Sequence, residues 1–202
     1  MYILRKSLWI GFLVRISTPE FIALMAMLVA TVALSIDGML PALPHIAAQL
    51  SPESPNQAQL ILSSFVVGMA LGTFFMGPLS DSFGRKRIIY FGAGLYVLSA
   101  AVCMIATSLE TMLIARLLQG IGAAGPRVIS QALVRDLYSG REMARISSFI
   151  MVVFALVPAM APLIGAGVMI AFEWQAIFAV FIVFVVVSTS WMGLRIQEPI
   201  TA

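Results

Sequence analysis

Cysteine, histidine and charged residues are scarce in this sequence of 202 residues. The single cysteine, Cys103, lies inside an apolar run, which excludes a disulfide framework, a zinc ribbon and a thiol redox pair. The single histidine, His45, cannot supply the several imidazole ligands of haem-bearing bundles or of most metal sites. We therefore expect neither a cofactor nor a metal ion.

Charged residues make up 10% of the chain and hydrophobic residues 61%, with a mean hydropathy of +1.03. A water-soluble domain usually has about 25% charged and about 45–50% apolar residues. A soluble globular enzyme is therefore excluded. Because a membrane-spanning helix needs about 20 apolar residues, the length accommodates roughly six such helices.

Apolar runs predict where these helices lie along the chain. The predicted spans cover residues 21–43, 57–77, 88–107, 111–133, 146–172 and 175–194. The connections between them are short, so consecutive helices are expected to be antiparallel neighbours. The predicted fold is an all-α membrane protein, a six-helix bundle over residues 21–194 between an N-terminal tail (1–20) and a C-terminal tail (195–202).

The first residues of the chain resemble the start of a secretory signal, because Arg5 and Lys6 precede an apolar stretch over residues 7–14. That stretch is too short to span a bilayer, Arg15 interrupts it, and no small-residue cleavage site follows. We interpret the segment as a cytoplasmic tail, with an interfacial helix anchored by Trp9 as one form that it can take.

The basic residues indicate the orientation, because lysine and arginine favour the cytoplasmic side of short loops. Every lysine and arginine except Arg116 lies in or beside the tails, the second loop or the fourth loop. The other three loops carry only glutamates: Glu53, Glu110 and Glu173. Both termini are therefore expected in the cytoplasm. The net charge of +3 does not indicate nucleic acid, because the basic residues follow the topology instead of forming one patch.

Arg127 lies just inside the cytoplasmic end of the fourth predicted span, whereas Asp37 and Arg116 lie further inside their spans and would each cost about 2.5–3.5 kcal/mol at a helix centre. Asp37 lies about 15 residues into its span, which leaves roughly 8 Å of a core about 30 Å thick above it. Arg116 lies about five residues from the outer start of its helix, also roughly 8 Å deep. The two side chains can therefore share one level. They form a structural ion pair, or the carboxylate of Asp37 reaches the outer interface, or they form a site where Asp37 titrates and Arg116 holds its charged form or an anionic group.

Helix breakers follow both charges. The first span has Gly38, Pro41 and Pro44, and the fourth has Gly120, Gly122, Gly125 and Pro126. Interrupted helices near a cavity are typical of transporter binding sites, whereas kinks also serve packing alone. If the bundle consists of two three-helix repeats, spans one and four are equivalent, and the shared pattern favours a functional site.

Small residues elsewhere indicate packing. Gly68 and Gly72 have the Gly-x-x-x-Gly spacing, and small side chains recur along the fifth span. Such residues let helix backbones approach closely in a bilayer.

The second cytoplasmic loop, residues 77–87, reads Gly-Pro-Leu-Ser-Asp-Ser-Phe-Gly-Arg-Lys-Arg. Glycines permit a tight turn at the membrane surface, and the basic triplet keeps the loop inside the cell. The segment resembles the signature Gly-x-Leu-x-Asp-x-x-Gly-Arg-Lys/Arg-x of the major facilitator superfamily. The residues that carry this cytoplasmic gate motif are Gly77, Asp81, Gly84, Arg85, Lys86 and Arg87.

Three further stretches resemble the drug:proton antiporters of that superfamily, especially the bicyclomycin-resistance branch. Residues 116–124 match the fourth-helix motif Arg-x-x-Gln-Gly-x-Gly-Ala-Ala, which implies proton coupling by Arg116 and Gln119. Residues 37–44 are similar to the end of the first helix, and residues 135–138 fit the same branch. The fifth-helix antiporter motif Gly-Pro-x-x-Gly-Gly is only partly present, because Pro162 and Gly165 remain while Ala stands at the other two positions.

The resemblance implies the N-terminal half of a proton-coupled efflux transporter in a bacterial inner membrane, whose partners are lipid, protons and a small hydrophobic or amphipathic substrate. Transport would need a second six-helix half, either a missing C-terminal half or a homodimer partner, and the chain is expected to end where the linker between halves begins. One alternative is a truncated fragment that inserts without activity. A remote one is an intramembrane protease, for which His45 at the outer end of the first span is poorly placed.

Overall fold

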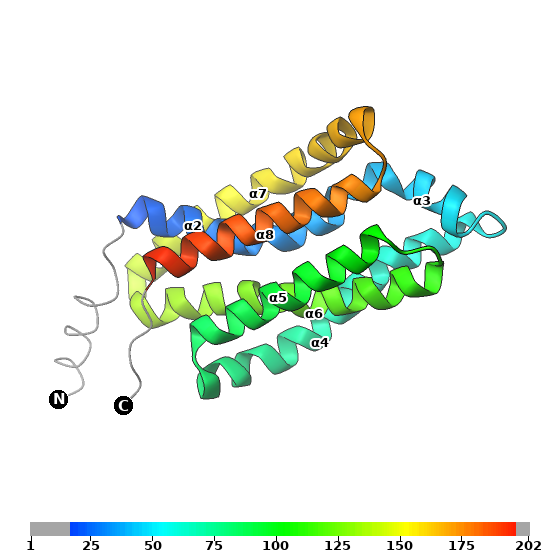
Figure 1. The fold of residues 1–202 in the computed structure, drawn as a ribbon. Coiled ribbons are helices and arrows are strands. Elements are labelled where there is room, and N and C mark those ends of the chain that lie inside the picture. Colours follow the sequence, from blue (N-terminus) through cyan, green and yellow to red (C-terminus); the bar gives the residue numbers. More distant parts are fainter. Residues whose placement is uncertain (1–16, 197–202) are drawn as a thin grey trace.

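The computed structural model describes residues 17–196, which are almost entirely helical (Figure 1). The elements are α2 (Thr18–Asp37), η1 (Leu40–Ala42), α3 (Leu43–Leu50), η2 (Pro55–Gln59), α4 (Leu60–Phe83), α5 (Arg85–Met104), α6 (Leu109–Leu137), α7 (Gly140–Ala171) and α8 (Gln175–Arg195). The predicted tails lie mostly outside the described residues.

The first span is a broken helix. Ser17 caps α2, and α2 ends at Asp37, after which η1 and α3 continue outward to Leu50. The α-helix is interrupted because Pro41 and Pro44 have no N–H to donate to the carbonyl four residues earlier. The whole segment Thr18–Leu50 is long and apolar enough to cross a membrane.

The predicted second loop is almost entirely helical. α4 continues through Gly77 and Pro78 to Phe83, and α5 begins at Arg85. Gly84 alone separates the two helices, with a φ of 95° that a residue with a Cβ rarely adopts. The expectation that Gly77 forms part of the turn is therefore wrong, and the turn requires only Gly84.

The fourth span is not broken as the first span is. α6 continues without interruption past Gly120 and Pro126 to Leu137. Five helical segments of the described chain are apolar enough to be recognised as membrane spans, and α6 is not among them. Its composition explains this, since it carries Arg116 and Arg127 within its length and charged residues at both ends. α6 is stabilised in the bundle by packing against neighbouring helices, which bury Arg116, and not by an apolar composition along its whole length.

The helices form two groups of three. α6 packs with α4 and α5, and α2 packs with α7 and α8 (Figure 1). Span four therefore packs with spans two and three, span one packs with five and six, and the contact of α5 with α8 joins span three to span six. If spans one, two and three are exchanged with spans four, five and six in that order, the same pairs of spans are in contact. A bundle of two three-helix repeats requires this symmetry.

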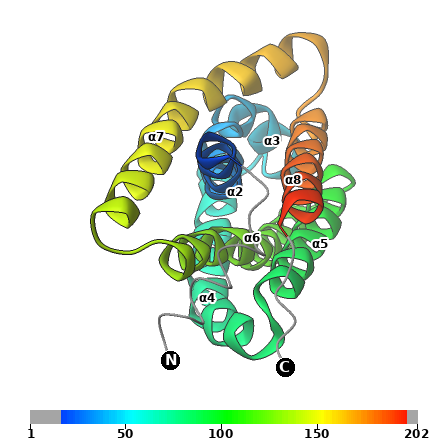
Figure 2. The ribbon, with the colours of Figure 1, turned by 90° about the vertical axis from the view of Figure 1, so that its left-hand side faces the viewer.

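Among consecutive spans of the described residues, only three and four pack extensively. The expectation that consecutive helices are neighbours is therefore wrong for the other pairs, because a short connection fixes the distance between helix ends and not the packing along the helices. Figure 2 shows α7 along one side, with α2 between it and α8.

Candidate functional site

Arg116 is completely buried where α6 packs against α2 and α4. Its Nη2 donates to the Ser35 carbonyl at 3.0 Å, and its Nη1 donates to Oε1 of Gln119 at 2.7 Å. Its Nε lies 3.5 Å from the Ile61 carbonyl, and its guanidinium carbon lies 4.4 Å from the centroid of the Phe65 ring. Neutral groups from three helices therefore surround a charge that is costly in a bilayer interior unless it has partners.

Close approach of α4 and α6 makes this arrangement possible. Arg116 and Gln119 are three residues apart and share one face of α6. Gly120, one residue on, faces the backbone of α4, where a Cβ would overlap the carbonyl of Phe65. Because position 120 has no side chain, Phe65 and the Ile61 carbonyl reach the guanidinium group.

Asp37 is partly buried at the end of α2, two residues beyond the Ser35 carbonyl that Arg116 binds. The structure therefore places Asp37 within one helical turn of the Arg116 site, at the level that the depth estimate predicts. Within residues 17–196 the ion pairs involve Arg85 and Arg195, and none joins Asp37 to Arg116. The direct ion pair that sequence alone left open is not formed.

A second layer of polar groups holds Ser35 in place. Its Oγ donates to the Thr31 carbonyl at 2.6 Å and lies 2.5 Å from the hydroxyl of Tyr96 on α5, which must then be the donor. Tyr96 is 1% exposed. The sequence patterns did not identify Ser35 or Tyr96 as site residues. A tyrosine in the middle of an apolar span does indicate a polar partner nearby, because its buried hydroxyl needs one.

The break in the first span is covered by α7. A Cβ at Gly165 would overlap the carbonyl of Gly38 and would lie 3.4 Å from Cδ of Pro41. Pro162 lies one turn earlier in the same helix, partly buried. The part of the fifth-helix motif that this chain retains is thus in contact with the residues that directly follow Asp37.

At the other end of the bundle, Arg85 joins three helices. Its guanidinium binds Asp81 of α4 at 2.7 Å and Asp136 of α6 at 3.2 Å, and it donates to Oγ of Ser80 at 2.6 Å. Asp136 belongs to the 135–138 stretch that sequence analysis singled out without a role. A Cβ at Gly77 would meet only Val128, at an ordinary distance of 3.9 Å, so nothing in the packing requires a glycine there.

Lys86 and Arg195 join this end of the bundle to α8 and α2. Lys86 Nζ donates to the carbonyls of Gly193 and Ile196 at 2.8 and 3.1 Å, where a helix C-terminus favours a cation. Arg195 binds Glu20 of α2 at 2.8 Å. The start of α2 and the end of α8 therefore lie together, while Arg87 is exposed.

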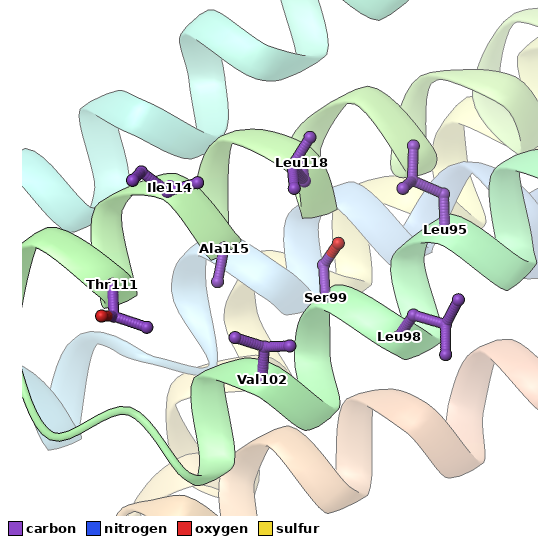
Figure 3. A pocket seen from close by; sticks show the side chains of 8 residues that line it. All are labelled: Leu95, Leu98, Ser99, Val102, Thr111, Ile114, Ala115 and Leu118. Atoms are coloured by element: carbon purple, nitrogen blue, oxygen red, sulfur yellow. The ribbon is translucent and has the colours of Figure 1, made fainter.

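A groove of about 270 Å³ lies between α5 and α6, apart from these charged residues (Figure 3). It is lined by Leu95, Leu98, Ser99, Val102, Thr111, Ile114, Ala115 and Leu118. The lining is apolar apart from two hydroxyl groups, so the groove lacks the charged groups of the Arg116 site.

A buried arginine beside a broken helix, in a six-helix membrane bundle, is the arrangement of a secondary transporter. The family model of the Major Facilitator Superfamily matches residues 23–200, and the chain belongs to this superfamily. It is therefore related to membrane transporters and not to enzymes, which removes the intramembrane protease.

Three curated relatives are similar to this chain, and the names of two of them bear on the branch. A bicyclomycin resistance protein homolog of Haemophilus influenzae is 41% identical over 81% of this chain and 41% of its own length. An uncharacterized MFS-type transporter of Bacillus subtilis, YdgK, is 34% identical over 87% of this chain and 44% of its own length. Multidrug resistance proteins MdtL of Escherichia coli are 34% identical over 71% of the chain. The chain spans less than half the length of these relatives.

Two solved structures share the fold. The human organic anion transporter MFSD10 superposes with a TM-score of 0.70 at 18% identity, over 91% of this chain and 49% of its own. The POT family transporter PepTSo superposes with a TM-score of 0.69 at 17% identity, over 90% of this chain and 39% of its own. The bundle is thus half of a major facilitator fold, as the sequence predicts.

Proposed function

We propose that this chain is one half of a proton-coupled efflux antiporter that exports small hydrophobic or amphipathic compounds across a bacterial inner membrane, with both termini in the cytoplasm. The likeness to a bicyclomycin resistance protein homolog and to multidrug resistance proteins supports the substrate class. The observation that carries the proposal is the buried Arg116 next to the helix break at Asp37.

Asp37 is the proposed proton carrier. It is the last residue of α2, where the broken segment leaves it partly exposed, so both water and a neighbouring cation can reach it. A carboxylate beside a guanidinium group favours its charged form, and a desolvated one favours protonation. Substrate that alters the surroundings of Asp37 therefore changes its affinity for a proton, while Arg116 and Gln119 adjust that affinity.

The Arg85 cluster is the proposed cytoplasmic latch. Asp81, Arg85 and Asp136 lie at helix ends, and the two carboxylates are 65% and 50% exposed while Arg85 is 27% exposed, so their ion pairs are weak and easily exchanged. Lys86 and Arg87 add positive charge at the same end. Such pairs suit a contact that breaks and reforms as two halves rock against each other.

A second six-helix half completes the proposed transporter. α7 and α4 are the least buried of the five apolar spans and present large apolar side chains on several faces. More than one side of each helix is thus open to contact with a second half as well as with lipid. The second half is the continuation of the reading frame or a second copy of the chain; failing both, the truncated fragment without activity is the remaining interpretation.

The test is Asp37→Asn in proteoliposomes, with a panel of uncharged amphipathic antibiotics that includes radiolabelled chloramphenicol. We expect the wild-type chain, with its second half where the reading frame supplies one, to accumulate antibiotic under a proton gradient. The variant should lose gradient-driven accumulation, because an amide cannot carry the proton.

Glu110→Gln is the matched control, because it removes an exposed carboxylate from the start of α6. It should transport as the wild type does. Coupled transport at the wild-type rate by Asp37→Asn, with equal amounts of inserted protein, would refute the role of Asp37.

A further inference from the structure

Arg127 is a second arginine within the apolar length of α6, and the Arg116 site does not include it. It lies 11 residues after Arg116, which places the two only about 20° apart around the helix. Arg127 therefore faces the same side of α6 as Arg116, toward α4. The contact of its Nη1 with the thioether sulfur of Met69, at 3.3 Å, agrees with this direction.

The guanidinium group of Arg127 lies far along the bundle from its charged, cytoplasmic end. Asp81 and Asp136, which both bind Arg85, mark one level at the cytoplasmic end. Arg127 precedes Asp136 by nine residues, or about 13 Å, and Met69 precedes Asp81 by twelve, or about 18 Å. Because side chains on a helix lean toward its N-terminus, the group extends away from the cytoplasmic end and does not reach back to it.

This charge lacks an anionic partner within residues 17–196. Met69 is the acceptor for its side chain, and a neutral thioether is a weak one. The ion pairs of the described residues involve Arg85 and Arg195 only. Arg116, in contrast, is completely buried and bound by two good acceptors. Arg127 is partly exposed, so a ligand can reach it.

The surroundings of Arg127 are apolar with hydroxyl and amide groups. Val66, Ala70 and Thr73 are exposed on the face of α4 that flanks Met69, and Gln131 is exposed one turn further along α6. The Thr73 hydroxyl donates to the Met69 carbonyl and keeps its lone pairs free. A ligand at this position would find a cation, polar groups and an apolar wall.

We propose that Arg127 is a binding site for the anionic group of an amphipathic organic anion, such as a carboxylate or sulfonate on an apolar ring system. A planar guanidinium group has five N–H donors and pairs well with such groups. The inference deepens the proposed function by adding amphipathic anions to the uncharged compounds of the transport assay, and it rests on that function for the role of the site in transport.

The test compares two fluorescent probes with the same ring system on the purified chain in zwitterionic lipid nanodiscs. 1-Anilinonaphthalene-8-sulfonate carries an anion, and N-phenyl-1-naphthylamine is its uncharged counterpart. With the signal of empty nanodiscs subtracted, the wild-type chain should bind both. Arg127→Met should weaken binding of the sulfonate about tenfold, the size expected for loss of a charged hydrogen bond, and should leave the uncharged probe within about twofold.

Arg127→Lys keeps the charge and should retain part of the affinity for the sulfonate. Arg135→Met is the matched control, because it removes an exposed arginine two turns later on the same helix and should change neither affinity. Removing a charge from a membrane helix favours insertion, so Arg127→Met is expected to fold. Circular dichroism and gel filtration verify this.

Equal sulfonate affinity in the wild type and Arg127→Met would overturn the proposal, as would an equal loss for both probes. Absence of sulfonate binding to the wild type would also overturn it and would make a carboxylate of the second half the expected counter-ion. Binding does not depend on Asp37 or on a proton gradient. A chain that fails to transport but discriminates between the probes therefore refutes the proposed function and supports the anion site.

Discussion

At the scale of single residues, Arg116 shows how a membrane bundle accommodates a charge without a counter-charge. Two good acceptors, a long contact to a third and an aromatic face replace the water that the guanidinium group would otherwise bind. Each group is neutral, and no ion pair joins Asp37 to Arg116 within residues 17–196, as the proposed role of Asp37 requires. A direct ion pair would instead hold Asp37 in its charged form.

Arg116→Lys tests whether the geometry of the guanidinium group matters beyond its charge. Lysine retains the charge but lacks the planar fork that reaches Ser35 and Gln119 together. We expect the free energy of unfolding to fall by about 2 kcal/mol, since hydrogen bonds to charged groups each contribute about 1.5–3 kcal/mol. Unfolding in denaturing detergent, followed by circular dichroism, measures this.

Arg135→Lys, at an exposed position of the same helix, serves as the control and should leave stability unchanged. If Arg116→Lys is as stable as the wild type, the hydrogen bonds of the guanidinium group are not what stabilises the buried charge.

At the scale of helices, small residues determine how closely α6 approaches its neighbours. Cβ atoms at Gly68 and Gly120 would overlap backbone carbonyls across the α4–α6 contact, and those at Gly92 and Gly122 would lie 2.7 and 2.6 Å from each other's carbonyl across the α5–α6 contact. These distances favour the packing interpretation of the glycines in the fourth span, which is not interrupted at all. The break in the first span is different, because prolines stop the helix there.

Gly120→Ala tests this packing. The added methyl group overlaps the carbonyl of Phe65, which as backbone moves only when the helix moves. We expect a loss of about 1–3 kcal/mol of stability, typical of overpacking, and a lower thermal midpoint of the detergent-solubilised chain in size-exclusion chromatography.

Gly167→Ala is the matched control, since nothing lies within 4 Å of a Cβ at that position of α7. Its stability should equal that of the wild type or exceed it slightly, because alanine is the better helix former. Equal midpoints for the two variants would contradict close packing at Gly120.

At the scale of the whole molecule, the charges divide the bundle into two ends. Glu20, Arg85, Lys86, Asp136 and Arg195 interact at one end. At the other, Trp174 donates to Gln49 at 2.6 Å without a charge on either partner. The positive-inside rule predicts that the first end is cytoplasmic.

Single introduced cysteines test this orientation. Ser82→Cys lies at the charged end and Glu53→Cys at the opposite end, both at exposed positions. The native Cys103 is buried and should contribute little background. A membrane-impermeant maleimide should label Cys at position 53 in spheroplasts and at position 82 only in inverted vesicles; the reverse result would mean that the termini face outward.

The helices, their antiparallel order and their family could be predicted from local features of the sequence, because apolar runs, basic loops and short motifs act over a few residues. The 77–87 motif was recognised although its structure was not a loop, since the pattern specifies residue types and not the length of the helices that carry them. Helix ends were predicted less well. The actual positions depend on whether prolines fall where a backbone bond is required, as at Pro41, or inside a helix that tolerates them, as at Pro126.

The sequence by itself determined that the chain spans a membrane, which residues carry charge within it and that Asp37 and Arg116 can share a level. Only the tertiary structure decided that Arg116 binds the Ser35 carbonyl of α2 and not the carboxylate of Asp37. It also decided that Tyr96 binds Ser35 and that Gly165 packs against the break after Asp37. The physical reason is that these contacts join helices far apart in the sequence. Their distances depend on side-chain volume and backbone approach, which a linear pattern does not encode.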